Sequence, residues 1–342
     1  MKGTLAVFDA IGGRSAAAFL RDGELDDLLI DAPGNRIRPG AIFRAKAGRP
    51  MKGQGGIMLE TPQGRVYLRR AKGVAQGQSL LVQATTFAES GKATPVTDRI
   101  VIKSRYALAT PSAPGLNISR DIKDEKRRVG LRSLTDGLTD QTLGLVLRSA
   151  AAEAEDEAVL ADAEAVLGLA RRVMAEPLTG SPDLLLDGPD SAGIARREWP
   201  EPDITDNEFG GFDRHGVTEM IGVLAGPRVD LAGAGYVFVE PTRALVAVDV
   251  NTGGDTSPAA GLKANISAMR ALPRILRVRG LGGQIVLDLA PCPKKDRRQV
   301  EQACRSAFRR DPIETSLAGW TLLGHLELNR KRERLPLSEA LS

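Results

Sequence analysis

Two aspartates, each at the end of a short apolar run, are the residues of this sequence best suited to chemistry. Asp249 ends a run that begins at Ala244 and is followed after one residue by Asn251, and Asp288 ends a run that begins at Gly282. Such runs are typical of strands buried on both faces of a sheet. An unpaired carboxylate there is costly, so each aspartate is expected to have a cation or a hydrogen-bonding partner. Two carboxylates at the ends of adjacent strands would hold a hard divalent metal ion, which suggests phosphodiester chemistry.

The Asp249 segment also has a purely structural interpretation. Asp, Asn and Gly in residues 249–255 favour a turn because of their local hydrogen bonds and backbone freedom. A second strand that ends in aspartate favours the catalytic interpretation over the structural one.

Composition narrows the possible classes of protein. The 342 residues suffice for two or three domains, and a net charge of +4 is weak evidence for a nucleic-acid partner. Cys292 and Cys304 form no CxxC motif, which excludes a zinc ribbon or a disulfide framework and fits a reducing cytoplasm. With only His215 and His325, a zinc–histidine site or a Ser-His-Asp triad is not expected. The apolar stretch at the N-terminus is too short for a signal peptide, and no run is long enough to span a membrane.

The first third of the chain is expected to be β-structure. Residues 1–35 predict a meander of strands Thr4–Phe8, Ser15–Arg21 and Leu25–Ile30, with a hairpin turn at Asp22-Gly23. Residues 36–103 contain short alternating segments with turn residues between them. That spacing predicts a small barrel such as an OB-fold.

The remaining residues predict a mixture of helices and strands. Residues 104–190 contain the basic stretch Lys123–Arg128, a strand at Leu143–Leu147 and a helix from about Ala150 to Met174, and residues 177–206 suggest a boundary or loop. Residues 228–342 predict a compact α/β unit. Its expected elements are strands Gly235–Glu240 and Ala244–Val250, a helix near 259–278, the strand that ends at Asp288, a helix near 294–310 and a strand near 322–328.

Three segments of this α/β unit resemble the catalytic core of the ribonuclease E/G family. They are Leu245–Asn251, Leu281–Asp288 and Gly324–Arg332, and the resemblance keeps good register through Val229–Leu337. It is weaker over the rest of the chain. Two aspartate strands at this spacing are a fairly specific pattern, whereas one alone would not be.

Earlier segments resemble other parts of the same family. Residues 41–45 and 74–84 look like its RNA-binding OB barrel, and residues 117–120 and 144–149 look like its 5′-end sensor. The resemblance implies a multi-domain α/β and β protein with an RNase H-like scaffold, an inserted OB-fold (S1-type) barrel and 5′-sensor, and a DNase I-like α/β metal-binding unit. The corresponding ranges are 1–35 and 185–227 for the scaffold, 36–103 for the barrel, 104–184 for the sensor region and 228–342 for the catalytic unit.

The resemblance also implies residue roles at the catalytic site. Asp249 and Asp288 match the carboxylates that hold Mg²⁺, and Asn251 matches the residue that supports them through hydrogen bonds. Mn²⁺ remains open as the ion, because it accepts the same oxygen ligands. A metal-activated water would attack the phosphodiester and leave a 5′-phosphate and a 3′-hydroxyl.

Further matches concern RNA binding. Arg148 and Ser149 match the pocket for a 5′-monophosphate, Tyr67 a base-stacking aromatic and Lys92 a phosphate-contacting lysine, while Arg120 lies in a sensor-like segment. Structural alternatives remain open for two of these positions. Arg148-Ser149 could be an ordinary strand end or a helix N-cap, and Tyr67 could be part of the barrel core.

The sequence departs from the family pattern at several positions. Met58 replaces a second aromatic of the barrel, the loop after Asn251 is shorter, and Pro291 lies where an acidic residue often follows the second aspartate. The sequence ends before the family's zinc link, so a zinc-linked dimer is not expected and the oligomeric state is open.

Three functions are compatible with these patterns. The first is a magnesium-dependent, single-strand-specific endoribonuclease of RNA processing or turnover, which would cut AU-rich RNA near a 5′-monophosphate. The second is a catalytically weak or inactive RNA-binding protein of the same fold. The third, a phosphohydrolase acting on small molecules, would leave the barrel unexplained.

Overall fold

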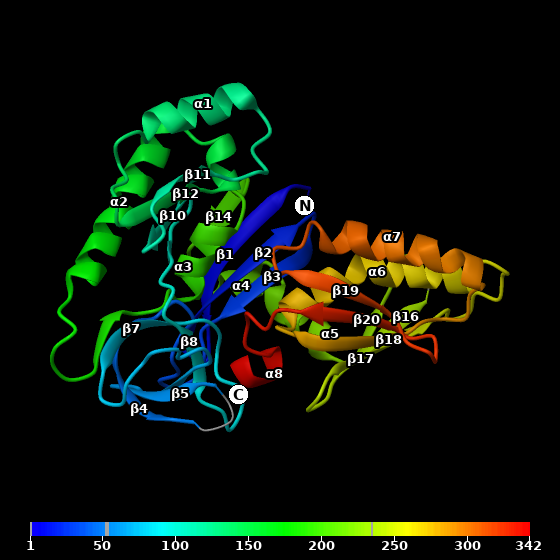
Figure 1. Cartoon of the computed structure of the whole chain (residues 1–342). Helices are drawn as coiled ribbons and strands as arrows, with labels where there is room; N and C mark the ends of the chain where they lie inside the picture. Colours follow the sequence, from blue (N-terminus) through cyan, green and yellow to red (C-terminus); the bar gives the residue numbers. More distant parts are fainter. Residues whose placement is uncertain (1, 52–54, 234) are drawn as a thin grey trace. The chain divides into compact units, whose positions relative to one another are not determined.

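The chain folds into two compact units. The computed structural model describes residues 2–51, 55–233 and 235–342. We call residues 1–34 with 202–342 the split unit, because two distant parts of the chain form it, and residues 35–201 the inserted unit. Figure 1 colours the chain by residue number, so the split unit comprises the dark-blue strands β1–β3 and the segments from green β14 to the red C-terminus. Among the helices of the described residues, none combines the length and the apolar character needed to cross a membrane.

A small sheet begins the split unit. Its strands lie in the order β14-β1-β2-β3, and β14 runs parallel to β1. Their bounds are β1 Thr4–Ile11, β2 Arg14–Arg21, β3 Glu24–Ile30 and β14 Ile204–Asp206. Asp22 and Gly23 both have positive φ, at 51° and 82°, as the predicted two-residue hairpin turn requires. The short helices α4 (Gly211–Arg214) and α5 (Val217–Ala225) follow β14.

A six-stranded sheet forms the rest of the split unit. The strand order is β15-β16-β17-β18-β20-β19, and β17 and β18 are parallel neighbours joined by helix α6. The bounds are β15 Arg228–Asp230, β16 Tyr236–Pro241, β17 Val246–Asn251, α6 Ala260–Val278, β18 Gly283–Asp288, the 3₁₀ turn η2 Lys294–Asp296, α7 Arg297–Phe308, β19 Thr315–Trp320, β20 Leu326–Arg330 and α8 Leu337–Ala340.

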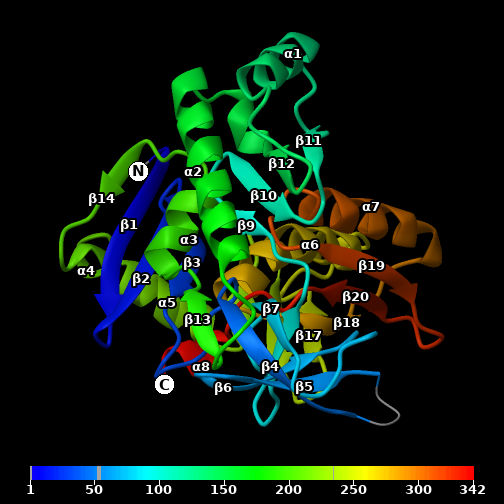
Figure 2. The ribbon, with the colours of Figure 1, turned by 60° about the vertical axis from the view of Figure 1, so that its left-hand side comes forward.

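One face of this sheet packs against helices, and the side chains of the other face are half-buried or exposed. Val248 and Leu287 point into a core that also contains Met269 and Leu272 of α6. Figures 1 and 2 show α6 and α7 together along this face. The residues that alternate with the core positions lie on the opposite face, which we call the open face.

Buried charges join several elements of the split unit. Asp311, between α7 and β19, forms ion pairs with Arg277 of α6 and Arg330 of β20, and the side chains of Asp311 and Arg330 are fully buried. Arg277 also binds Asp26 of β3, with 2.8 Å between Nη2 and Oδ1. Arg334 pairs with the buried Asp27. We call these residues the arginine–aspartate network.

The inserted unit begins with a closed barrel. Its strands follow the order β4-β5-β6-β8-β7, and β7 pairs back onto β4. The bounds are β4 Ile42–Pro50, β5 Ile57–Thr61, β6 Gly64–Leu68, β7 Ser79–Ala84 and β8 Thr94–Thr97, and β13 (Asp183–Leu186) extends the sheet beside β4. Phe43, Leu59 and Val82 are fully buried in its core. The predicted OB-like barrel is therefore present.

A second sheet completes the inserted unit. Its strands lie in the order β11-β12-β10-β9, and helices α1 and α2 accompany it (Figure 2). The bounds are β9 Ile102–Lys103, β10 Ala107–Pro111, β11 Gly115–Ile118, α1 Glu125–Leu134, β12 Leu143–Leu147, the 3₁₀ turn η1 Ser149–Ala152, α2 Asp156–Ala175 and α3 Ser191–Glu198. Leu145 and Leu147 of β12 pack with Val159 and Leu167 of α2 in one core.

Several expected boundaries differ from the structure. The helix expected from about Ala150 begins only at Asp156, because η1 comes first. The boundary or loop expected at residues 177–206 contains β13, α3 and β14. Strands β15 and β19 were not expected, and the last strand begins at Leu326 rather than near Leu322.

Candidate active site

The two aspartates of the open face are direct neighbours. Strands β17 and β18 run parallel, and Asp249 pairs in register with Asp288. Parallel strands present their carboxyl ends at the same edge of the sheet, so both side chains lie at that edge on one face. The expected adjacency of the two strand ends is confirmed.

The expected burial of these strands is wrong. Val246, Val248 and Val250 are buried, but Asp249 between them is exposed. Strand β18 alternates in the same way, and the side chain of Asp288 is 70% exposed. Each strand is therefore covered on one face only. The two carboxylates are accessible from solvent, so their charge does not require a buried partner.

Two neighbouring side chains contact the aspartates. Asn251 is two residues beyond Asp249 on the same face of β17, and its Nδ2 donates to Oδ2 of Asp249 at 2.9 Å. His325 lies just before β20, and its Nδ1 is 3.4 Å from Oδ1 of Asp288. Each carboxylate therefore has a polar neighbour on this face, and the hydrogen bond from Asn251 restricts the orientation of Asp249.

The backbone beyond each aspartate is held by close packing. Gly235 has φ +72°, and a Cβ atom there would lie 1.9 Å from the carbonyl oxygen of Asn251. Gly261 of α6 is equally close to the segment after β18, since its Cβ would lie 2.0 Å from the carbonyl oxygen of Pro291. Only glycine lets these segments approach so closely.

A buried amide fixes the residues that follow Asp288. Asn265 of α6 is fully buried, and its Nδ2 donates to the carbonyl oxygen of Ala290 at 2.9 Å. The backbone N–H of Ala290 donates in return to Oδ1 of Asn265 at 2.9 Å. These two bonds connect α6 to the end of the Asp288 strand. Asn265 thus acts on this region through the backbone.

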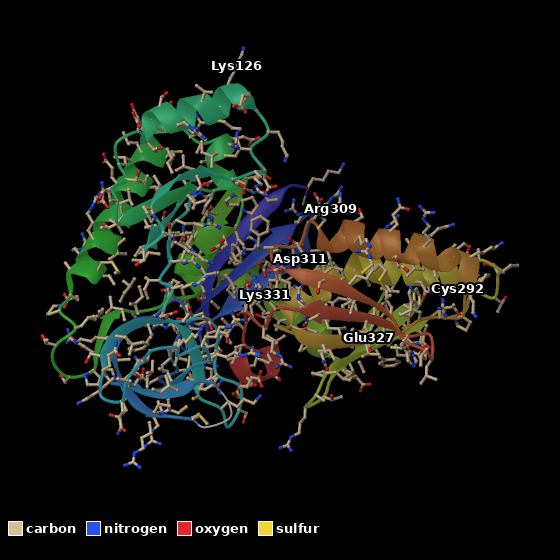
Figure 3. The ribbon with its side chains drawn as sticks, in the orientation of Figure 1. Lys126, Cys292, Arg309, Asp311, Glu327 and Lys331 are labelled. Carbon is tan, nitrogen blue, oxygen red and sulfur yellow. The ribbon has the colours of Figure 1, made fainter. Side chains whose placement is uncertain are left out.

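Other polar residues of the unit have different environments. Asp255, in the loop after β17, accepts from the backbone N–H of Ser257, which lowers the pKa of its carboxyl, and Lys263 is 3.5 Å away. Glu327 pairs with Val286 and lies on the open face (Figure 3). Arg330, by contrast, is buried in the arginine–aspartate network and is not a residue of the open face.

A basic cleft of the split unit lies away from the aspartates. Its volume is about 680 Å³, and Arg270, Arg274 and Arg310 are among the residues that line it. Figure 3 shows Arg309 at the end of α7, far along the sheet from Cys292, which follows the Asp288 strand. The cleft is therefore not part of the carboxylate site.

Few side chains that could bind a metal ion lie beside the two aspartates. Within residues 2–51, 55–233 and 235–342, no group of three or more His, Cys, Asp or Glu side chains is arranged to hold a metal ion. Two adjacent carboxylates with an amide and an imidazole beside them are the donors at this edge. Oxygen donors suit hard cations that retain much of their water shell.

Arg148 directly follows β12, and its side chain has partners within the protein. Its Nη1 donates to the carbonyl oxygen of Ser104 at 2.6 Å, and it forms an ion pair with Glu198. Burial by itself raises the pKa of Glu198, but the charges of Arg148 and Arg197 outweigh it and the pKa is lowered. Ser149 is exposed and begins η1 without a side-chain cap.

The three other predicted RNA-binding residues lie on the surface of the inserted unit. Tyr67 lies on the outer side of β6, since its neighbours Val66 and Leu68 point into the barrel, so it is not barrel core. Its ring packs over Gly56, where a Cβ atom would lie 2.3 Å from the hydroxyl oxygen. Lys92 is exposed and pairs with Glu89 at 2.5 Å, and Arg120 is exposed after β11.

The chain is similar in sequence to known proteins. The model of the "Ribonuclease E/G family" matches residues 101–209 and 203–333, which together cover more than half of the chain. The chain belongs to the ribonuclease E/G family. Similar proteins include ribonuclease G of Haemophilus influenzae, 27% identical over 305 residues, and ribonuclease E of Synechocystis sp., 28% identical over 329 residues.

Ribonuclease G of Escherichia coli (strain K12) is 29% identical over 310 residues. These alignments cover 78%, 83% and 78% of this chain, but 62%, 49% and 62% of the Haemophilus, Synechocystis and Escherichia proteins, respectively. The chain therefore spans about half to three fifths of the length of the family members that it matches.

Three residues of the open face were not predicted from the sequence. His325 lies in a segment that resembles the family, but only the pairing of β18 with β20 brings it to Asp288. Tyr236 and Phe238 of β16 lie opposite Asn251 and Asp249. The alternation in Tyr-Val-Phe-Val could have placed both rings on one face of that strand.

Proposed function

We propose that this member of the ribonuclease E/G family is a magnesium-dependent endoribonuclease that cuts single-stranded RNA. The observation that carries the proposal is the in-register pairing of Asp249 and Asp288 on the accessible face of the sheet. The relatives named ribonuclease E and ribonuclease G support it. An open face rather than a closed pocket also suits a polymeric substrate.

The donors present fit a hard divalent cation. Asp249 and Asp288 would hold it, and two protein carboxylates are enough because Mg²⁺ keeps several of its waters. When bound, the ion supplies polarisation of the scissile phosphate and a water of lowered pKa. Mn²⁺ accepts the same ligands and would serve as well.

The protein's own side chains orient the site. Asn251 keeps Oδ2 of Asp249 in a fixed direction through a hydrogen bond, and the imidazole of His325 lies beside Oδ1 of Asp288. Asn265 keeps the residues after Asp288 in place. Water attacks in line with the leaving 3′-oxygen, so the products carry a 5′-phosphate and a 3′-hydroxyl.

The inserted unit would recognise the 5′ end of the RNA. We assign Arg148 and Ser149 to a 5′-monophosphate, since a guanidinium and a hydroxyl suit phosphate oxygens. Glu198 already binds Arg148, so the phosphate must compete with this carboxylate or use the remaining N–H groups. This competition makes the sensor selective for a dianionic end group over a hydroxyl.

The barrel surface would bind the RNA strand. Tyr67 provides a ring on its outer side for base stacking, and Lys92 provides an exposed positive charge for a phosphate. Arg120, after β11 of the second sheet, provides another exposed charge. We expect AU-rich RNA as the substrate in RNA processing or turnover in the cytoplasm.

Finer features of the architecture belong to the same proposal. Residues 1–35 and 185–227 would form an RNase H-like scaffold, and residues 228–342 a DNase I-like catalytic unit. Between them, residues 36–103 would form the OB barrel and 104–184 the 5′-sensor region. The sheet β14-β1-β2-β3 and the βαβ unit that carries both aspartates are compatible with this division.

An RNA-binding protein with little catalysis is the second candidate. The observation that favours it is the small donor set, since no group of three potential metal-binding side chains occurs in the described residues. Such a protein would bind RNA equally well with magnesium or EDTA and would leave it intact.

Cleavage of a labelled AU-rich single-stranded RNA separates the two candidates. The unmodified protein should cut it with Mg²⁺ and not with EDTA, and faster with a 5′-monophosphate than with a 5′-hydroxyl. Asp249→Asn or Asp288→Asn should lower the rate about 100-fold or more, because the ion contributes several kcal/mol to the transition state. Glu314→Gln, an exposed carboxylate before β19, is the control and should cut normally. If Asp288→Asn cut the RNA as fast as the unmodified protein, the proposal would be refuted.

A further inference from the structure

The open face carries a pair of aromatic rings beside the aspartates. In β16, Val237 and Val239 are buried in the core, so Tyr236 and Phe238 point to the opposite face, where both are half-buried. Large rings left accessible on a sheet face lose contact area that a core position would supply. Their placement therefore calls for an explanation beyond the stability of the strand.

Strand register places these rings next to the catalytic candidates. β16 and β17 are antiparallel, with Phe238 opposite Asp249 and Tyr236 opposite Asn251. Side chains opposite each other in such a pair share a face and have Cβ atoms about 4.5–5.5 Å apart. A ligand group that contacts Phe238 therefore lies next to any group bound by Asp249.

The two rings are held in fixed positions. Their centroids are 5.6 Å apart and their planes meet at 87°, an edge-to-face arrangement. The guanidinium of Arg228 lies 4.0 Å from the Tyr236 centroid, and both Nε and Nη2 of Arg228 donate to Oδ1 of Asp230, at 3.1 and 2.9 Å. Rings already fixed in this way lose little conformational freedom when a ligand binds.

We propose that Tyr236 and Phe238 form a stacking shelf for an unpaired nucleobase adjacent to the scissile phosphate. The proposal rests on the ribonuclease function, because the phosphate beside Asp249 and Asp288 defines which base reaches the shelf. A planar base suits an open shelf, since one ring face stacks while the polar edges remain hydrated. Arg228, which stacks on Tyr236 and pairs with Asp230, keeps that ring in place beside the site.

The shelf also assigns a substrate requirement. Base stacking tolerates any base but needs the base to be free of a helix, because a paired base is already stacked on both sides. The shelf therefore selects single-stranded RNA at the cleavage site itself, independently of the inserted unit. If the rings only stabilised β16, replacing them would not change how the protein binds RNA.

Oligonucleotides that lack one base test the shelf. We would prepare a series of fluorescent RNAs, each with an abasic spacer at one position around the cut. Fluorescence anisotropy then measures the affinity of the protein for each RNA in EDTA, where no cleavage occurs. For the unmodified protein, the spacer should weaken binding about tenfold at one position next to the cut. In the variants Phe238→Leu and Tyr236→Leu, the spacer at that position should lower the RNA affinity by less than about twofold. The proposal is overturned if the spacer penalty is the same in both variants as in the unmodified protein.

Phe209→Leu is the matched control. Phe209 is 90% exposed and lies before α4, which packs against β1 of the small sheet, so its variant should retain the full spacer penalty. Loss of the penalty in this variant too would contradict the assignment to the shelf.

Photocrosslinking provides a test that needs no variant. RNA with 5-iodouridine at the sensitive position should crosslink to the tryptic peptide 229–243, which contains both rings, and crosslinking to other peptides only would overturn the proposal. The outcomes separate the two proposals. RNA that is crosslinked but not cut would refute the ribonuclease function and support the shelf. RNA that is cut without any spacer effect would support the ribonuclease function and refute the shelf.

Discussion

Asp249 owes its orientation to a single hydrogen bond on the open face. Asn251 reaches it from the same strand at 2.9 Å, because residues two apart in a strand share a face. An exposed carboxylate without such a neighbour samples several rotamers. The amide therefore reduces the reorganisation needed when a cation binds.

We expect Asn251→Ala to weaken the site without disturbing RNA binding. The metal concentration for half-maximal cleavage should rise about 10- to 100-fold, the usual effect of losing a residue that orients a ligand. A magnesium titration of the cleavage rate measures this change, and anisotropy in EDTA measures RNA affinity. Asn329→Ala is the control, since Asn329 lies on the open face of β20. An unchanged magnesium midpoint for Asn251→Ala would contradict the role.

The sequence predicted the aspartate pair but not its surroundings. The two runs end in Asp, and that pattern is local, so it needed no tertiary information. Their exposure was misjudged because Ala247 and Val286 are apolar, which made alternating strands resemble fully buried ones. His325 depends on which strand lies beside β18, and neither its residue type nor its spacing contains that information.

Elements of the split unit are connected by charges as well as by apolar packing. Asp311 contacts α6 through Arg277 and β20 through Arg330, and Arg277 continues to β3. Removing one member of a buried ion pair leaves its partner's charge uncompensated. The network is therefore a point where several elements depend on one side chain.

Asp311→Asn should lower the free energy of unfolding by about 3–5 kcal/mol. Urea unfolding at neutral pH, followed by circular dichroism, measures this loss. The matched control is Glu314→Gln, which removes an exposed ion pair to Lys331 and should cost less than about 1 kcal/mol. Similar losses in the two variants would show that burial of the Asp311 pair is unimportant.

Local sequence patterns predicted some elements better than others. Strand Leu143–Leu147 and the hairpin at Asp22-Gly23 have strong local patterns, and both lie where expected. Strand β19 contains Thr, Ser and Gly and only partly buried side chains, so its apolar pattern is weak. Strand β13 has four residues, and pairing with β4 rather than its own pattern makes it a strand.

At the scale of the molecule, each hydrophobic core lies within one unit. Among the residues that the structure describes, the core around α6 is built from the split unit, and the cores of the barrel and of the α2 sheet are built from the inserted unit. The inserted unit is also a continuous stretch of chain. These two properties are what independent folding requires.

A fragment of residues 35–201 should therefore fold and bind RNA without cutting it. We expect one cooperative thermal transition by circular dichroism, and affinity for single-stranded RNA that falls as salt rises. Cleavage should be absent because both aspartates lie in the split unit. A fragment that shows no cooperative transition would mean that the inserted unit needs the rest of the chain.

The division of the split unit has a consequence for synthesis on the ribosome. Strands β1, β2 and β3 leave the ribosome before the rest of the split unit, yet Leu5, Val7 and Leu20 share their core with residues from positions 212–337. The inserted unit is complete long before these arrive. The nascent chain must therefore carry an uncovered apolar meander until those residues are made, which is the interval when chaperones would be needed most.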